Sequence, residues 1–107
     1  MLNQMILVGR LTNEIVVEKN KDKSKEYKKY AVISLAVPRN FKNSDGVYDT
    51  DFIDCYALDS IAECTCSSCH KGDIVGVKGR IERVDSNLDI RLIAEKVNHL
   101  SSKQQEE

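Results

Sequence analysis

Tryptophan is absent from this sequence, and there are only five glycines and one proline in 107 residues. So little glycine and proline leaves no flexible linker or low-complexity segment, and 107 residues suffice for one ordinary core, so a single domain is expected. Long apolar runs are also missing, which excludes a transmembrane helix. Hydrophobic residues still make up 41% of the chain, enough to build a packed core.

The first ten residues, MLNQMILVGR, contain no basic leader and no small-residue cleavage site, so a secretory signal is not expected. The expected location is therefore the cytoplasm, where the four cysteines stay reduced, and no membrane partner is expected.

Charge of either sign is nearly balanced, with 16 Lys and Arg against 17 Asp and Glu. This balance argues against a strongly basic nucleic-acid binder. However, residues 1–43 carry nine basic and four acidic side chains, whereas residues 44–107 carry seven and thirteen. A locally positive face is compatible with that asymmetry, and the local field counts for more than the total charge.

Alternating apolar residues predict β-strands over most of the chain. The expected strands cover residues 5–8, 31–37, 48–58, 73–83 and 88–94, with turns at 43–46 and 85–87. Gly9 indicates a bend or close packing beside the first strand. The charged stretch 18–29 has no apolar periodicity and is expected to be an exposed loop or hairpin tip.

One segment, residues 59–70, breaks the alternation with apolar and small residues at helical spacing. It predicts a short helix that Asp59 or Ser60 caps at its start and that ends near Gly72. Five strands with one helix between the third and fourth are the layout of an OB-fold, a Greek-key β-barrel. The sequence therefore predicts an all-β OB-fold domain over residues 1–100, followed by a short polar tail, 101–107.

No constellation of residues predicts an enzyme. The two histidines, His70 and His99, are far apart in sequence, and neither a nucleophile elbow nor a phosphate loop is present. The segment Cys64–His70, C-T-C-S-S-C-H, contains three thiols and an imidazole that are candidate ligands for a cofactor.

The last five letters of that segment, from Cys66 to His70, match a haem-attachment motif, and its thiols and imidazole are also zinc ligands. No export signal and no second cysteine pair support either group, and Cys64 and Cys69 fall on the apolar stripe of the predicted helix. We therefore expect these cysteines to pack as small hydrophobic residues, with no cofactor. A metal, haem or redox role for Cys66 and Cys69 is the remote alternative.

Two aromatic residues, Phe52 and Tyr56, share one face of the third predicted strand, and Ile53 begins the opposite face. If the Ile53 face points into the barrel, both rings point outward, and an exposed aromatic pair calls for a binding partner. A protein–protein interface, or a core position for the Phe52 face, are the alternatives.

Cationic side chains accompany these rings. Phe41 lies between Arg39 and Lys42 just after the second strand, and Lys78 and Arg80 point outward on the fourth. Single-stranded nucleic acid needs this combination, because bases stack on rings and phosphates meet Lys and Arg without any base edge being read.

Three blocks of the sequence resemble bacterial single-stranded-DNA-binding proteins. LNQMILVGRLT resembles their first strand, AVISLAVPRNFKNSDGVYDTDFIDC is similar to their second and third strands, and HKGDIVGVKGRIE to the helix end and fourth strand. The blocks occur in the family's order across about residues 1–100. The resemblance implies an OB-fold protein that assembles, usually as a homotetramer. It also implies binding of single-stranded DNA without sequence preference during replication, recombination and repair.

The family's stacking positions fall at Phe41 and Phe52 in this sequence. A third falls at Leu58, which stacks poorly, and a fourth has no ring in the loop 84–87, while a basic first-strand position falls at Gln4. The DNA-binding residues predicted from pattern and resemblance together are Tyr30, Arg39, Phe41, Lys42, Phe52, Tyr56, Lys71, Lys78 and Arg80.

Two further segments bear on partners. The first strand, residues 3–11, is a candidate edge for pairing with another protomer. In the charged stretch, Lys28, Lys29 and Tyr30 are expected to face DNA, whereas residues 18–24 are expected to be a solvated tip.

The end of the chain, SSKQQEE, lacks the acidic, Phe-ended tip of the family's long tail, so DNA coating without a tail-recruited partner is expected. A dimeric accessory OB protein of the primosome type and an RNA-binding OB domain of the cold-shock kind are the alternatives. No second aromatic-rich strand supports the latter.

Overall fold

The computed structural model describes residues 1–84 and 89–102. Its elements in chain order are β1 (Met5–Leu11), β2 (Glu18–Lys19), β3 (Lys29–Lys42), β4 (Tyr48–Leu58), α1 (Ser60–Ser68), β5 (Ile74–Arg83) and β6 (Ile90–Ser101). Among the residues described, no helix is long and apolar enough to cross a membrane.

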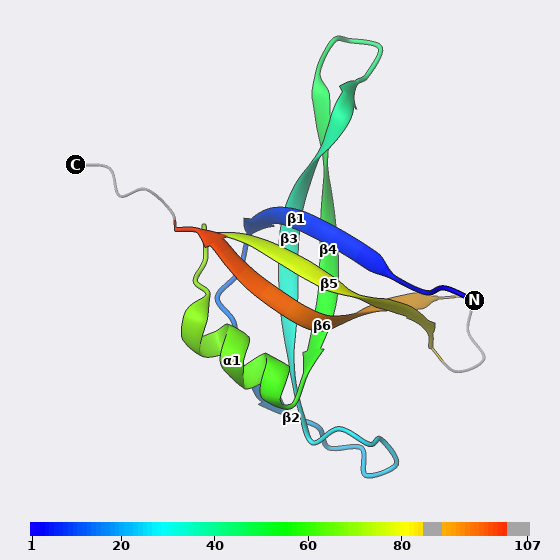
Figure 1. The fold of residues 1–107 in the computed structure, drawn as a ribbon, viewed down its shortest axis with the longest axis vertical. Coiled ribbons are helices and arrows are strands. Elements are labelled where there is room, and N and C mark those ends of the chain that lie inside the picture. Colours follow the sequence, from blue (N-terminus) through cyan, green and yellow to red (C-terminus); the bar gives the residue numbers. More distant parts are fainter. Residues whose placement is uncertain (85–88, 103–107) are drawn as a thin grey trace.

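The five long strands form a closed barrel. The strand order is β1-β5-β6-β4-β3-β2, and an additional β1–β3 pairing closes the ring. All pairings are antiparallel except β4–β6. This arrangement confirms the OB-fold expected from the sequence. In Figure 1 the β3–β4 hairpin rises well beyond the barrel, and the loop between β2 and β3 lies at the opposite end.

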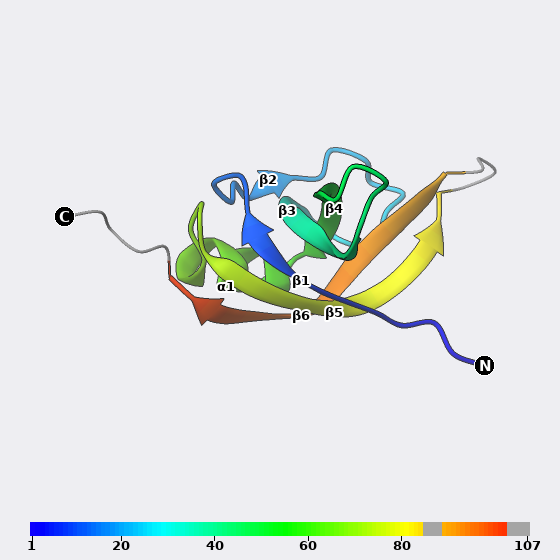
Figure 2. The same cartoon turned by 90° about the horizontal axis from the view of Figure 1, so that it is seen from above.

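Strand alternation sorts the side chains as predicted. Cys55 and Ala57 of β4 are fully buried, whereas Phe52 on the other face is exposed. The face that includes Ile53 is therefore the inner one. The rest of the core comes mainly from the inward residues of the other strands: Leu11, Ala31, Ile33, Leu35, Val75, Val77 and Ala94. Helix α1 adds Ala62 to this cluster. Figure 2, seen from above, shows β1, β5 and β6 curving beneath β3 and β4.

Two glycines allow strands to approach closely where the barrel bends. A Cβ at Gly9 would lie 2.6 Å from the Ala36 carbonyl oxygen, so the β1–β3 contact that closes the barrel requires glycine there. A Cβ at Gly79 would overlap the Ile93 carbonyl oxygen, at the register shift between β5 and β6. The close packing expected at Gly9 is confirmed.

Several boundaries differ from the prediction. Strand β6 continues to Ser101 instead of ending at residue 94, because β5 pairs with it over its full length. Strand β3 covers Lys29–Lys42 because its pairing with β4 continues into the hairpin. Part of the expected loop 18–29 forms β2, which pairs with Tyr30 and Lys29. The predicted turn at 85–87 lies outside the described residues.

The predicted position of the helix cap is confirmed at Asp59, but its side chain does not make the expected capping hydrogen bond. Asp59 occupies the N-cap position but makes no side-chain cap hydrogen bond, and its φ of 48° is left-handed. Its carboxylate instead accepts hydrogen bonds from the backbone N–H groups of Lys28 and Lys29, at 2.9 and 3.1 Å. Asp59 therefore ties the start of β3 to the end of β4, an interaction that local sequence rules do not describe.

Candidate nucleic-acid interface

Phe52 is exposed on the outer face of the barrel. Its exposed fraction is 75%, and its cross-strand partner on β3 is the small residue Ala36, which leaves the ring uncovered. Phe41, near the tip of the hairpin, is 60% exposed. The premise that both rings lie outside the core is thus confirmed.

Arg39 and Phe41 form a group of their own. The Arg39 guanidinium donates two hydrogen bonds of 3.0 Å to Asp51, lies 3.8 Å from Asp49 and is 6.0 Å from the Phe41 ring centroid. Neighbouring strand residues point to opposite faces, so Asp51 and the Arg39 group lie on the face of the hairpin opposite Phe52. The two predicted stacking rings are therefore divided between two faces of the hairpin.

The Arg39–Asp51 pair also changes what Arg39 offers to a ligand. The hydrogen bond from Arg39 lowers the pKa of Asp51, and the same bond raises the pKa of Arg39. Both groups stay charged at neutral pH, and the positive charge of Arg39 already faces two carboxylates. A phosphate would have to compete with them for the guanidinium.

Lys42 belongs to the Phe52 face. It pairs with Tyr48 across the hairpin, and its ammonium lies 5.7 Å from the Tyr48 ring centroid. Tyr48 is exposed and lies on the same face of β4 as Thr50 and Phe52, because every second residue of a strand points the same way. The sequence analysis did not single out Tyr48, although the same alternation that identified Phe52 extends to it.

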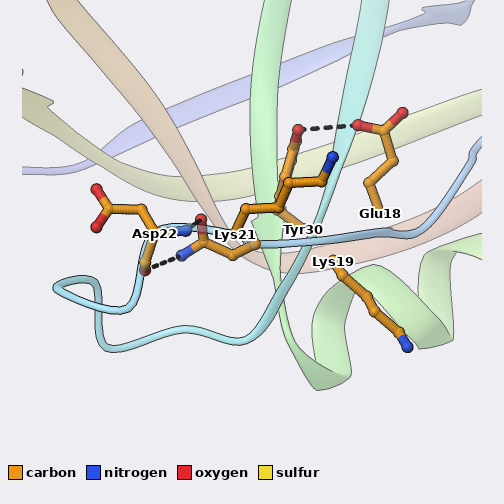
Figure 3. A pocket seen from close by; sticks show the side chains of 6 residues that line it. Glu18, Lys19, Lys21, Asp22 and Tyr30 are labelled. Atoms are coloured by element: carbon orange, nitrogen blue, oxygen red, sulfur yellow. Dashed lines mark hydrogen bonds between the residues drawn. The ribbon is translucent and has the colours of Figure 1, made fainter.

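Tyr30 lies at the far end of the outer face from the hairpin. Its hydroxyl donates a 2.8 Å hydrogen bond to Glu18, which raises the pKa of Tyr30. Figure 3 shows this hydroxyl directed at Glu18, above an open pocket that Lys19, Lys21 and Asp22 help to line. Because Glu18 holds the hydroxyl, the ring of Tyr30 has a defined orientation on the barrel surface.

Tyr56 is half-buried on the same outer face. It pairs with Val32, one pleat from the Tyr30–Leu58 pair, so Tyr30 and Tyr56 are diagonal neighbours. The guanidinium carbon of Arg91 lies 4.6 Å from the centroid of the Tyr56 ring. Sequence reasoning missed Arg91, because only the pairing of β4 with β6 brings it to Tyr56.

The predicted cations are dispersed. Lys78 pairs with Ile6 of β1 and Lys96 of β6, a row on the outer face of β1, β5 and β6 rather than beside Phe52. Lys71 lies in the turn that precedes β5 and is exposed. The structure brings neither lysine into recorded contact with the rings of β4.

Arg80 is engaged by acidic neighbours. One guanidinium nitrogen lies 2.7 Å from Glu82 and another lies 3.9 Å from Glu95. Lys29, expected to face DNA, makes a 2.6 Å ion pair with Glu63 of α1. These contacts reduce the positive charge that Arg80 and Lys29 present to an anion.

The four cysteines are free thiols. Cys55 and Cys69 are buried, and burial raises the pKa of the Cys55 thiol to about 11. Cys66 contacts the Ile15 carbonyl at 3.3 Å. Cys64 is exposed, so the expectation that it packs as a small hydrophobic residue on the apolar stripe of the helix is wrong, whereas Cys69 is buried as expected. Within residues 1–84 and 89–102, no group of three or more His, Cys, Asp or Glu side chains is placed to hold a metal ion.

A closed OB barrel that carries exposed rings on β3 and β4 and cations on β3 is typical of OB-fold proteins that bind nucleic acid. Comparison with known proteins then gives the family. Residues 2–90 match the model of the Single-strand binding protein family. The chain belongs to this family.

Two relatives of this chain are named single-stranded DNA-binding proteins. The chain is 41% identical over 86 residues to single-stranded DNA-binding protein B of Bacillus subtilis (strain 168), covering 77% of this chain and 69% of that protein. It is 38% identical over 82 residues to single-stranded DNA-binding protein 3 of Streptococcus agalactiae serotype V, covering 77% and 56%. The chain thus spans little more than half the length of the second of these relatives.

A solved structure supports the fold. The crystal structure of the small single-stranded DNA-binding protein from Streptomyces coelicolor superimposes with a TM-score of 0.67, covering 92% of this chain and 94% of that one. At 21% identity, this likeness bears on the fold alone.

Proposed function

We propose that this chain binds single-stranded DNA without sequence preference and coats it during replication, recombination and repair. Phe52 carries the proposal, since its ring is 75% exposed and shares a strand face with the exposed Tyr48, whose ring lies beside the Lys42 ammonium. Each base stacked on such a ring contributes about 1–3 kcal/mol, whichever base it is. The role is binding, without catalysis, and the expected cytoplasmic location remains a prediction.

The proposed contacts follow the two faces of the hairpin. Phe52 and Lys42 act on one face, and Phe41 and Arg39 on the other, so the strand passes over the hairpin instead of along one groove. Tyr30 and Tyr56 extend the path across the barrel. Lys71, Lys78 and Arg80 contribute to the field and are not assigned a stacked base.

Self-association would multiply these modest contacts. One edge of β1 pairs with β5. On the opposite edge only Arg10 and Leu11 pair with a strand, β3, so Met5 to Gly9 have no partner on that edge among the described residues. Next to that edge, the side chains of Val8 and Leu100 lie over the backbone of Gly76, where any other residue would place its Cβ. Together they form an apolar patch. We propose that a second copy covers this edge and apolar patch, leading to a tetramer or dimer. Linked protomers would then hold one strand at high effective concentration.

The test is a fluorescence-anisotropy titration with labelled poly-dT at two salt concentrations. We expect binding that weakens with salt, by about 0.7 in the log–log slope for each phosphate neutralised, and weak competition by duplex DNA. A clear preference for an RNA oligomer over poly-dT would contradict the proposal. Sedimentation of the free protein distinguishes the tetramer from the dimer expected of an accessory protein.

A further inference from the structure

A carboxylate, Asp54, lies between two aromatic residues on the outer face of β4. The alternation that places Phe52 and Tyr56 on this face also places Asp54 there, and Asp54 is exposed. Residues that follow one another on the same face of a strand are roughly 7 Å apart, so the carboxylate lies beside any base that stacks on Phe52. A negative charge opposes phosphate binding, and its presence at this position calls for a different role.

The cross-strand partner of Asp54 is Ser34 of β3. Residues directly opposite in an antiparallel pair have Cβ atoms about 4.5–5.5 Å apart, so the hydroxyl and the carboxylate share one small area of the outer face. The neighbours of Ser34 on this face of β3 are the apolar residues Val32 and Ala36, which pair with Tyr56 and Phe52. Ser34 and Asp54 thus place hydrogen-bonding groups between the two rings.

The Asp54 carboxylate has no ion pair or hydrogen bond with any other residue in 1–84 and 89–102, and the Ser34 hydroxyl has none either. Arg91 lies on β6, the strand beside β4, but its guanidinium carbon lies 4.6 Å from the centroid of the Tyr56 ring. The carboxylates of Asp51 and Glu82, by contrast, each meet an arginine. Asp54 is therefore free to accept hydrogen bonds from a ligand.

The donor pattern of the bases decides which ligand group fits. An ionised carboxylate only accepts hydrogen bonds, and its two oxygens suit two adjacent donors. Among the DNA bases only guanine has two adjacent donors on its Watson–Crick edge, N1–H and N2–H, with the acceptor O6 beside them. Adenine, cytosine and thymine each place an acceptor next to their donor, and that acceptor would face a carboxylate oxygen. Unpaired strands leave this edge free to be read.

We propose that Asp54 gives this chain a preference for guanine at one position of the bound strand. The carboxylate accepts hydrogen bonds from N1–H and N2–H of the base that stacks on Phe52, and the Ser34 hydroxyl donates a hydrogen bond to O6. The inference rests on the proposed DNA-binding function. The other proposed contacts, to ring faces and phosphates, carry no base preference, so the chain still coats strands of any sequence.

Repulsion contributes to this preference. A strand without guanine leaves the Asp54 charge unpaired beside the phosphates, which lowers the affinity for every other sequence. Asp54→Asn should therefore bind an all-dT oligomer a few-fold more tightly than the unmodified protein does. Because Asp54 is exposed and makes no contact that the substitution removes, the melting temperature should not change.

The base preference is measured by fluorescence-anisotropy competition. The competitors are dT oligomers of about 16 nucleotides, the upper site size of one OB-fold, with a single central dG, dA, dC or deoxyinosine. The dG oligomer should bind the unmodified protein about fivefold more tightly than the all-dT oligomer. Deoxyinosine lacks the N2 amino group and keeps N1–H, so its affinity should lie between the two.

Substitutions assign the preference to its residues. An amide offers one donor and one acceptor, which match the edges of adenine and cytosine, so Asp54→Asn should lose the dG preference and bind the dA and dC oligomers about threefold more tightly than the dG oligomer. Ser34→Ala should reduce the dG preference about twofold. The matched control is Asp45→Asn, which makes the same charge change at an exposed turn and should retain the full preference.

The competing outcomes are distinct. Normal binding of the all-dT oligomer without discrimination by the unmodified protein would overturn the guanine preference and leave the proposed function intact. A dG preference that survives in the Asp54→Asn protein would overturn its assignment to Asp54. Equal affinities for the dG and deoxyinosine oligomers would overturn the pair of hydrogen bonds. If the unmodified protein binds none of the oligomers, the proposed function fails, and the preference with it.

Discussion

The barrel has two outer faces of different chemistry. The face of β3 and β4 carries Phe52 and Tyr56 with charged residues around them, whereas the face of β1, β5 and β6 carries the exposed aliphatic side chains Ile6, Val8 and Leu100. Lys78 and Lys96 form a row with Ile6 on this second face. Both arise from the same alternation of side chains along strands. Aromatic rings beside cations suit stacked bases and phosphates, while aliphatic side chains beside an open strand edge suit another protein surface. We therefore expect one small barrel to bind a strand on one face and a second copy of itself on the other.

The largest effect is expected from removing the two phenylalanine rings, which tests whether these rings bind DNA. Phe41→Ala combined with Phe52→Ala should weaken poly-dT binding by about 2–6 kcal/mol per protomer if each ring stacks one base. Both rings are exposed, so circular dichroism and the melting temperature should barely change. Anisotropy measures the loss. Phe52→Trp keeps a stacking surface and is expected to retain binding, and unchanged affinity in the double variant would show that the rings are not used.

A charged substitution tests whether the aliphatic side chains on the face of β1, β5 and β6 form an interface with a second copy. Val8→Lys should dissociate the assembly, because lysine cannot be buried against a copy of the same patch, and affinity for long poly-dT should fall by about a hundredfold or more as multivalency is lost. Sedimentation velocity measures the mass. The matched control is Val47→Lys on the hairpin, where the valine is similarly exposed. A mass equal to that of the unmodified protein would contradict the proposed interface.

Gly9 lies where β1 meets β3, the contact that closes the barrel between the two outer faces. Gly9→Ala would place a methyl group 2.6 Å from the Ala36 carbonyl oxygen, so the strands must separate, and the expected cost is about 1–3 kcal/mol of unfolding free energy. Urea denaturation measures this cost. Gly76→Ala on β5 is the control, because its added Cβ would meet Leu100 at an ordinary 3.5 Å. Equal stabilities of the two variants would mean that the β1–β3 contact is not so tight.

The smallest expected effect concerns Asp51. Asp51→Asn releases Arg39 from its main carboxylate partner, so affinity for poly-dT should rise a few-fold, with a salt slope steeper by about 0.7. Because Arg39 lowers the pKa of Asp51, the pair contributes stability above the ordinary carboxyl pKa, and this is lost as the pH falls through the lowered value. The melting temperature of the unmodified protein should therefore fall more steeply in acid than that of the variant.

A control separates release of Arg39 from the mere removal of negative charge. Asp45→Asn makes the same change in net charge at an exposed turn. It should leave the salt slope unchanged. If both variants bind alike, the ion pair does not restrain Arg39.

The fold was largely predictable because its signals are local. The period-two pattern around Phe52 and Cys55 and the break at residues 59–70 were enough to predict five strands and one helix. The site was predictable only in part. The exposure of Phe41 and Phe52 followed from their positions, but the engagement of Arg39 by Asp51 did not. That contact depends on the register of the hairpin, and several acidic residues were equally available in sequence.

The sequence by itself determined which residues of each strand share a face, because successive residues of a strand point to opposite faces whatever the strand packs against. It thereby determined that Phe52 and Cys55 lie on opposite faces, and the closed barrel decided that the Cys55 face is the buried one. Only the tertiary structure decided which cations remain available, because charges pair through space. Arg80 and Arg39 meet carboxylates, whereas Arg91, brought beside β4 by the parallel pairing of β6, rests on the ring of Tyr56.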